Sequence, residues 1–148
     1  MNKYFSSNTS VTLGEAIRRL RLSEGENDAT DKMLVEAKKV FEQHDAVHIL
    51  FNCGTSIRDE IAVHVWMVFA TTANVGEMHR AVASQEHRNV MTDIGHFRLV
   101  RIWIRSLPHI LNIIYKSWRM KQRLPLEELH NLKKLPVLKI RQEYGIVL

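Results

Sequence analysis

Two histidines one helical turn apart are the residues of this 148-residue chain whose types and spacing are best suited to chemistry. His44 and His48 occupy positions i and i+4 of the segment His44-Asp45-Ala46-Val47-His48, so on a helix they would share one face. This is a spacing with which two imidazoles bind one zinc ion. No clear third ligand follows these two histidines, and Glu60 is the nearest candidate downstream.

The same five residues resemble the zinc-protease pattern H-E-x-x-H, with Asp45 where the pattern has its glutamate base. The resemblance implies a metal hydrolase whose ion is held by His44 and His48. Asp45 is one methylene shorter than glutamate, however, and the eight histidines of the chain are scattered over at least five predicted elements. We therefore adopt the plainer interpretation, two ordinary histidines near the end of an amphipathic helix, and expect no metal, no cofactor and no enzymatic activity.

The positive charge of the chain is concentrated in its last third. Residues 94–148 hold eleven basic and three acidic residues, a charge of +8, whereas the first 93 residues hold ten basic and thirteen acidic residues, a charge of −3. Such a basic region attracts polyanions: nucleic acid, an acidic membrane surface or an acidic protein. Arginine suits phosphate because its planar fork donates two hydrogen bonds at once. The cations predicted to bind a polyanion are Arg98, Arg101, Arg105, Lys116, Arg119, Lys121 and Arg123.

Apolar residues in the same region recur at alternating steps of three and four, which indicates one continuous helix face. The sequence leaves open whether this seam belongs to the core or forms a self-association surface. Two tryptophans nearby, Trp103 and Trp118, could stack on bases, but we expect them in the core. The seam consists of Phe97, Val100, Ile104, Leu107, Leu111, Ile114 and Trp118.

The single cysteine, Cys53, excludes an intramolecular disulfide and favours a reducing compartment. We find no apolar run long enough for a signal peptide or a membrane span, so we expect a cytoplasmic or nuclear protein. A catalytic pair of Cys53 with His48 or His64 is conceivable. A lone cysteine is far more often a small buried filler, and that is our interpretation.

Capping patterns and helical periodicity predict an all-α protein with a single domain. We expect a flexible N-terminus over residues 1–11, a compact bundle of six to seven helices over 12–136 and an extended tail over 137–148. Residues 47–51 could extend the second helix or form a brief strand. The predicted helices span 13–22, 31–44, 57–72 (the most buried), 76–87, a stretch that begins at Thr92 or Asp93 and is divided or kinked at Pro108, and 126–135.

Three hypotheses about function follow from these features. The first, which we adopt, is a non-enzymatic protein that binds RNA or another nucleic acid through its basic C-terminal helices, with an affinity that falls as salt rises. The second is a structural or adaptor protein, matrix-like as in a viral shell, which acts by self-association or by docking a partner. The third is the metal hydrolase that uses His44 and His48.

Overall fold

The computed structural model describes residues 11–24, 35–74, 76 and 96–148, and these confirm the all-α class. Within these ranges only two isolated β-bridges occur, Thr12 with Pro136 and Thr71 with Leu124, and no strand. The predicted helix 76–87, the caps at Thr92 and Asp93 and the N-terminus up to residue 10 lie outside the described residues. The helical elements are α1 (Leu13–Glu24), α2 (Val35–Leu50), α3 (Ile57–Ala70), α6 (His96–Trp118), the 3₁₀ helix η3 (Leu126–Glu128), α7 (Leu129–Leu132) and α8 (Val137–Tyr144).

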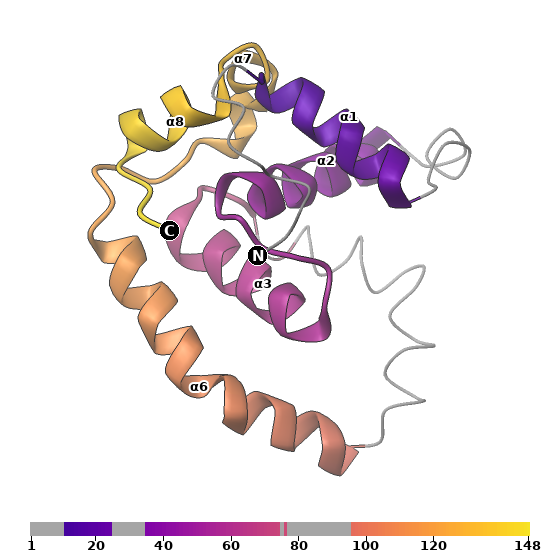
Figure 1. Ribbon diagram of the computed structural model, residues 1–148, viewed down its shortest axis with the longest axis vertical. Coiled ribbons are helices and arrows are strands. Elements are labelled where there is room, and N and C mark those ends of the chain that lie inside the picture. Colours follow the sequence, from indigo (N-terminus) through magenta and orange to yellow (C-terminus); the bar gives the residue numbers. More distant parts are fainter. Residues whose placement is uncertain (1–10, 25–34, 75, 77–95) are drawn as a thin grey trace.

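Helix α3 is the centre of the core, as its nearly uniform apolar composition predicts. It packs against α2 on one side and against α6 on the other (Figure 1). The Trp66 ring of α3 stacks on Phe51, which follows the end of α2, with ring centroids 4.2 Å apart. The buried residues of α3 are Ile61, Ala62, Val63, Val65, Trp66, Met67 and Ala70.

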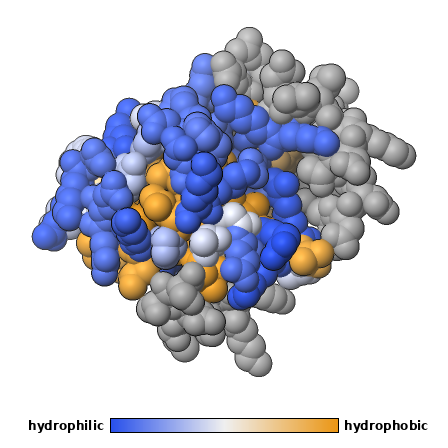
Figure 2. All heavy atoms as spheres, turned by 90° about the horizontal axis from the view of Figure 1, so that it is seen from above, coloured by the Kyte–Doolittle hydropathy of each residue, from blue (hydrophilic) through white to orange (hydrophobic). Residues whose placement is uncertain are grey.

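The beginning and the end of the described chain are joined by backbone hydrogen bonds. The amide of Leu13 donates to the carbonyl of Leu135, and the amide of Val137 donates to the carbonyl of Val11, at 3.0 and 3.1 Å. Gly14 allows this close approach, because a Cβ there would lie 3.2 Å from the Lys133 carbonyl oxygen. As a result α1, α7 and α8 share one side of the molecule, whose surface is mostly hydrophilic (Figure 2).

Helix α2 continues to Leu50, so the apolar run 47–51 extends a helix rather than forming a strand. Helix α6 likewise continues through Pro108 as one helix. Proline lacks the amide hydrogen of a regular helical bond, and the helix accommodates this loss on an exposed part of its surface. Of the two predicted arrangements, two helices or one kinked helix, the structure therefore has a single continuous helix.

The C-terminal residues correct the predicted boundaries. Residues 126–132 form a short 3₁₀ helix followed by one turn of α-helix, so the helix predicted over 126–135 is divided and ends earlier. Residues 137–144, predicted as an extended tail, form helix α8, and the residues after Gly145 have no regular secondary structure. Burial explains the difference: Ile140, Tyr144 and Ile146 pack into the core, and this packing stabilises a short helix that local sequence signals barely indicate.

Candidate metal centre

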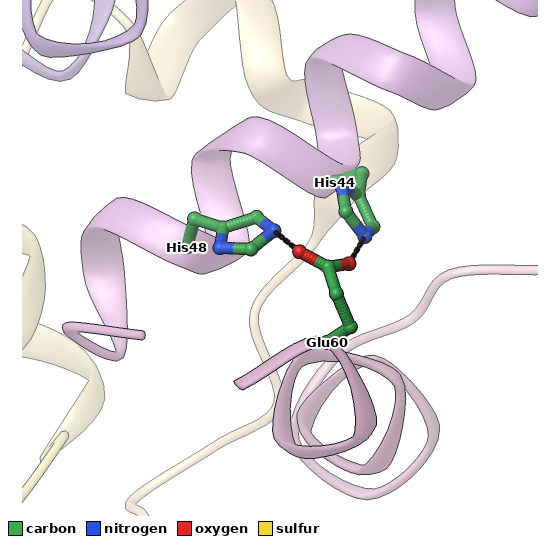
Figure 3. A group of neighbouring side chains, drawn as sticks. All are labelled: His44, His48 and Glu60. Carbon is green, nitrogen blue, oxygen red and sulfur yellow. Dashed lines mark ion pairs between the residues drawn. The ribbon is translucent and has the colours of Figure 1, made fainter. Parts of the chain in front are cut away.

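His44, His48 and Glu60 converge on one point between α2 and α3 (Figure 3). Nε2 of His44 lies 3.3 Å from one carboxylate oxygen of Glu60, and Nε2 of His48 lies 3.3 Å from the other. One ligand atom from each residue lies within 4.8 Å of the other two. A tetrahedral ion with bonds of about 2.1 Å needs ligand atoms about 3.4 Å apart. The two separations between imidazole nitrogen and carboxylate oxygen are therefore close to the separation that zinc requires.

The turn between α2 and α3 creates this convergence. Asn52 follows the last turn of α2 with a positive φ of 54°, and the amide of Cys53 donates to the carbonyl of His48 at 2.9 Å, which closes the helix end. Ser56 then begins α3 with a reciprocal capping box to Asp59. Because the chain reverses over so few residues, the first turn of α3 returns beside the last turns of α2 and places Glu60 opposite the two histidines.

The electrostatics of the cluster favour an ionised Glu60 carboxylate and a protonated His48 imidazole. Burial raises the pKa of Glu60, but the hydrogen bonds and positive charges of His44 and His48 outweigh it and hold the pKa well below its usual range. Burial lowers the pKa of His48, yet the hydrogen bond and charge of Glu60 raise it above its ordinary value. The Cys53 backbone also favours the protonated imidazole, although Nδ1 of His48 makes no hydrogen bond of normal geometry. The two contacts between Nε2 and the carboxylate thus occupy the place where an ion would sit.

Asp45 does not take the role of the glutamate in the zinc-protease pattern. Its carboxylate accepts a hydrogen bond from Nε of Arg21 on α1 at 2.7 Å, and both side chains are mostly buried. This ion pair engages Asp45 with α1. Asp45 therefore has a structural role: its ion pair with Arg21 attaches to α1 the part of α2 that holds both histidines.

His64, which the sequence suggested only as a partner for Cys53, is a further member of the neighbourhood of His44. It follows Glu60 by four residues on α3, and its ring centroid lies 5.6 Å from that of His44. Nδ1 of His64 lies 2.7 Å from the backbone oxygen of Glu60. Because a carbonyl oxygen can only accept a hydrogen bond, Nδ1 of His64 is the donor in this contact. The signal in the sequence was a second i, i+4 pair, Glu60 and His64, on the next helix.

Cys53 lies near the cluster without the properties of a nucleophile. The residue is buried, and burial, together with the charges of Asp59 and Glu60, raises the pKa of its thiol to about 12. A reactive cysteine needs the opposite shift. The interpretation of Cys53 as a buried filler is the one that its surroundings favour.

The predicted polyanion-binding cations occupy several different settings. Arg101 and Arg105 are exposed on α6, and Arg119 is exposed just after it, with its guanidinium 5.7 Å from the centre of the Tyr115 ring. Lys116 is half-buried, Lys121 donates to the backbone of Gln142, and Arg123 donates to the carbonyl of Val68. The side chain of Arg98 is outside the description. Arg101, Arg105 and Lys116 follow one side of α6, whereas Lys121 and Arg123 tie the following loop to α8 and α3.

The predicted seam is not the core face of α6. Ile114 alone among its described members is half-buried, and Trp118, expected in the core, is 76% exposed. The helix instead packs through Ile102, Ile110 and Ile113, with Ser106 and Ser117 buried beside them. The side chains of Phe97 and Trp103 are outside the description. The exposed members of the seam are Val100, Ile104, Leu107, Leu111 and Trp118.

Comparison with known protein families, with curated proteins and with solved structures finds no match for this chain. Among the described helices, none combines the length and the apolar character needed to cross a bilayer.

Proposed function

We propose that this protein binds a divalent transition-metal ion, zinc or one of similar preference, through His44, His48 and Glu60. The observation that carries the proposal is the convergence of two imidazole nitrogens and a carboxylate from two helices on one point. Imidazole and carboxylate are the donors that zinc accepts most readily beside thiolate. The proposal replaces our sequence-based expectation of two ordinary histidines.

The donor set also indicates which class of metal site this is. Two histidines and one glutamate leave a fourth position for water or a substrate, as in catalytic rather than structural zinc sites. An ion there would supply Lewis-acid chemistry of the kind used in hydrolysis. His64 is an additional titratable group of this neighbourhood, with its ring 5.6 Å from that of His44, whereas Asp45 is paired with Arg21. We therefore place the third sequence-based hypothesis, a metal hydrolase, ahead of the other two.

Metal binding is tested by stripping the protein with a chelator, restoring zinc and measuring bound metal and heat of binding. We expect one ion per chain, and a loss of affinity of more than about 100-fold in His44→Ala and Glu60→Gln, because loss of a ligand exceeds the 10- to 100-fold cost of losing a group that merely orients one. The matched control is His130→Ala, an exposed histidine on α7. Binding that survives Glu60→Gln, or that His130→Ala weakens equally, contradicts the proposal.

Polyanion binding through the C-terminal cations is the second candidate. It is supported by the placement of Arg101, Arg105 and Lys116 along one side of α6, where both arginines are exposed. The test is retention on heparin and on immobilised RNA, with wild type compared with the Arg98→Glu, Arg101→Glu, Arg105→Glu triple variant and circular dichroism confirming the fold. Affinity should fall steeply with salt. An affinity that is insensitive to moderate salt excludes this function.

A further inference from the structure

The outward side of α6 carries an apolar strip that no described part of the protein covers. Val100, Ile104, Leu107, Leu111 and Trp118 are between 49% and 76% exposed. Their positions, i, i+4, i+7, i+11 and i+18, fall on one line along the helix. The line extends for about 27 Å at the rise of 1.5 Å per residue. We call these five residues the apolar strip of α6.

A row of cations runs beside this strip. Arg101 and Arg105 each follow a strip residue by one position, which turns them about 100° around the helix axis. Lys116 lies on the same side of the helix as these two arginines. From His96 to Trp118 the helix contains no aspartate or glutamate. We call Arg101, Arg105 and Lys116 the basic strip of α6.

The helix thus has three sides with different surroundings. Ile102, Ser106 and Ile113 face the core, the apolar strip faces outward, and the basic strip lies between them on the polar side. Figure 1 shows α6 along the outer edge of the molecule, with α3 on its inner side. A surface that lies against the apolar strip is therefore within reach of the long, exposed side chains of Arg101 and Arg105 on the flank of the helix.

We propose that α6 docks on an anionic lipid bilayer surface, lying in the plane of the interface rather than crossing it. An interfacial helix needs an apolar side that enters the boundary of the acyl chains and a polar side rich in Lys and Arg that meets anionic headgroups. Trp118, at the end of the strip, supplies a side chain that prefers the headgroup level. The proposal gives a chemical class to the polyanion of the second candidate function and is independent of the metal centre.

Charge and chemistry favour this occupant over the others. A second copy of α6 would match apolar strip to apolar strip, but it would bring two helices without acids side by side, with cations on both. RNA would engage the basic strip and leave Ile104 and Leu111 in water, since aliphatic side chains offer bases no stacking platform. A bilayer with anionic lipids offers negative charge and apolar volume along the whole length of the helix.

The test measures co-sedimentation of the full chain with vesicles of phosphatidylcholine alone and of phosphatidylcholine mixed with phosphatidylglycerol. Wild type should bind the mixed vesicles and bind pure phosphatidylcholine far more weakly. Ile104→Ser with Leu111→Ser should lower the affinity for mixed vesicles by more than about 10-fold, because the variant no longer buries these two apolar side chains in the bilayer. Arg101→Gln with Arg105→Gln should lower it by about 5-fold per cation.

The matched control is Leu22→Ser with Arg18→Gln, an exposed apolar residue and an exposed cation on α1, which should leave vesicle binding unchanged. A wild-type protein that ignores mixed vesicles overturns the proposal. If it instead binds RNA, with an affinity that the arginine variant lowers and the Ile104/Leu111 variant leaves intact, the polyanion is nucleic acid. If the Ile104/Leu111 variant converts a dimer into a monomer and vesicles are ignored, a second copy covers the strip.

Discussion

Helices α3 and α6 are both long and rich in apolar residues, but they use those residues in opposite ways. Helix α3 lies between α2 and α6 and buries most of its circumference, and it places Glu60 at an inner junction with two histidines. Helix α6 lies at the edge, buries one side and leaves a line of large apolar side chains exposed. The comparison shows that apolar periodicity identifies an apolar face of a helix but does not identify what covers that face.

The largest expected effect is a difference in stability between substitutions on the two apolar sides of α6. Ile113 is 2% exposed, whereas Ile104 on the apolar strip is 60% exposed. Ile113→Ala should lower the free energy of unfolding by about 2–5 kcal/mol, because it leaves a cavity. Ile104→Ala should change it by less than about 0.5 kcal/mol, as expected for a surface residue. Urea unfolding of both variants measures the difference, and equal losses would show that the apolar strip is part of the core.

Zinc should stabilise the protein through the α2–α3 junction, and substitutions on the apolar strip of α6 should not change this stabilisation. At a free zinc concentration 100 times the dissociation constant, we expect the free energy of unfolding to rise by about 2.7 kcal/mol, because the ion binds the folded state. Thermal unfolding with and without zinc measures this increment. It should vanish in His48→Ala and persist in Ile104→Ser. An increment that survives the loss of His48 places the ion elsewhere.

Glu60 should also stabilise the metal-free protein. Its carboxylate is the hydrogen-bond partner of His48, whose side chain is 4% exposed. Glu60→Gln should lower the free energy of unfolding near pH 6 by about 1–2 kcal/mol, since a buried charged group loses its acceptor. Glu127→Gln, at an exposed carboxylate on η3, is the control and should have a much smaller effect. Chemical unfolding in the presence of a chelator distinguishes the two variants.

The most specific expectation concerns pH. The lowered pKa of Glu60 contributes stability above its unfolded value of 4.5 that is lost as pH falls toward the folded pKa. The raised pKa of His48 contributes stability below its unfolded value of 6.5 that is lost as pH rises through the folded pKa. The metal-free cluster should therefore be most stabilising between about pH 4.5 and 6.5.

With zinc bound, the stability of the cluster should no longer fall as pH rises above 6.5. The ion needs neutral imidazoles and displaces their protons, so its increment should grow as pH rises above 6.5. Unfolding measured across pH with a chelator and with zinc tests both trends. A zinc increment that is constant from pH 6 to pH 8 would show that histidines do not hold the ion.

Part of the candidate site was predictable because its signals are local. The i, i+4 spacing of His44 and His48 indicates a shared helix face, and the Ser56 capping box marks the start of α3. Glu60 could be named as a ligand only by its nearness in the sequence. Its position opposite both imidazoles depends on the direction in which the chain leaves Asn52, which is a property of a single backbone conformation.

The sequence by itself determined the helical class, the starts of α1 and α3 and the basic character of the last third, because caps, periodicity and charge are carried by neighbouring residues. Only the tertiary structure decided that the seam of α6 faces outward, that residues 137–144 are helical, and that Asp45 pairs with Arg21 while Glu60 meets the histidines. The physical reason is that burial and ion pairing depend on contacts between segments far apart in the chain, and a helical period specifies a face but not its neighbour.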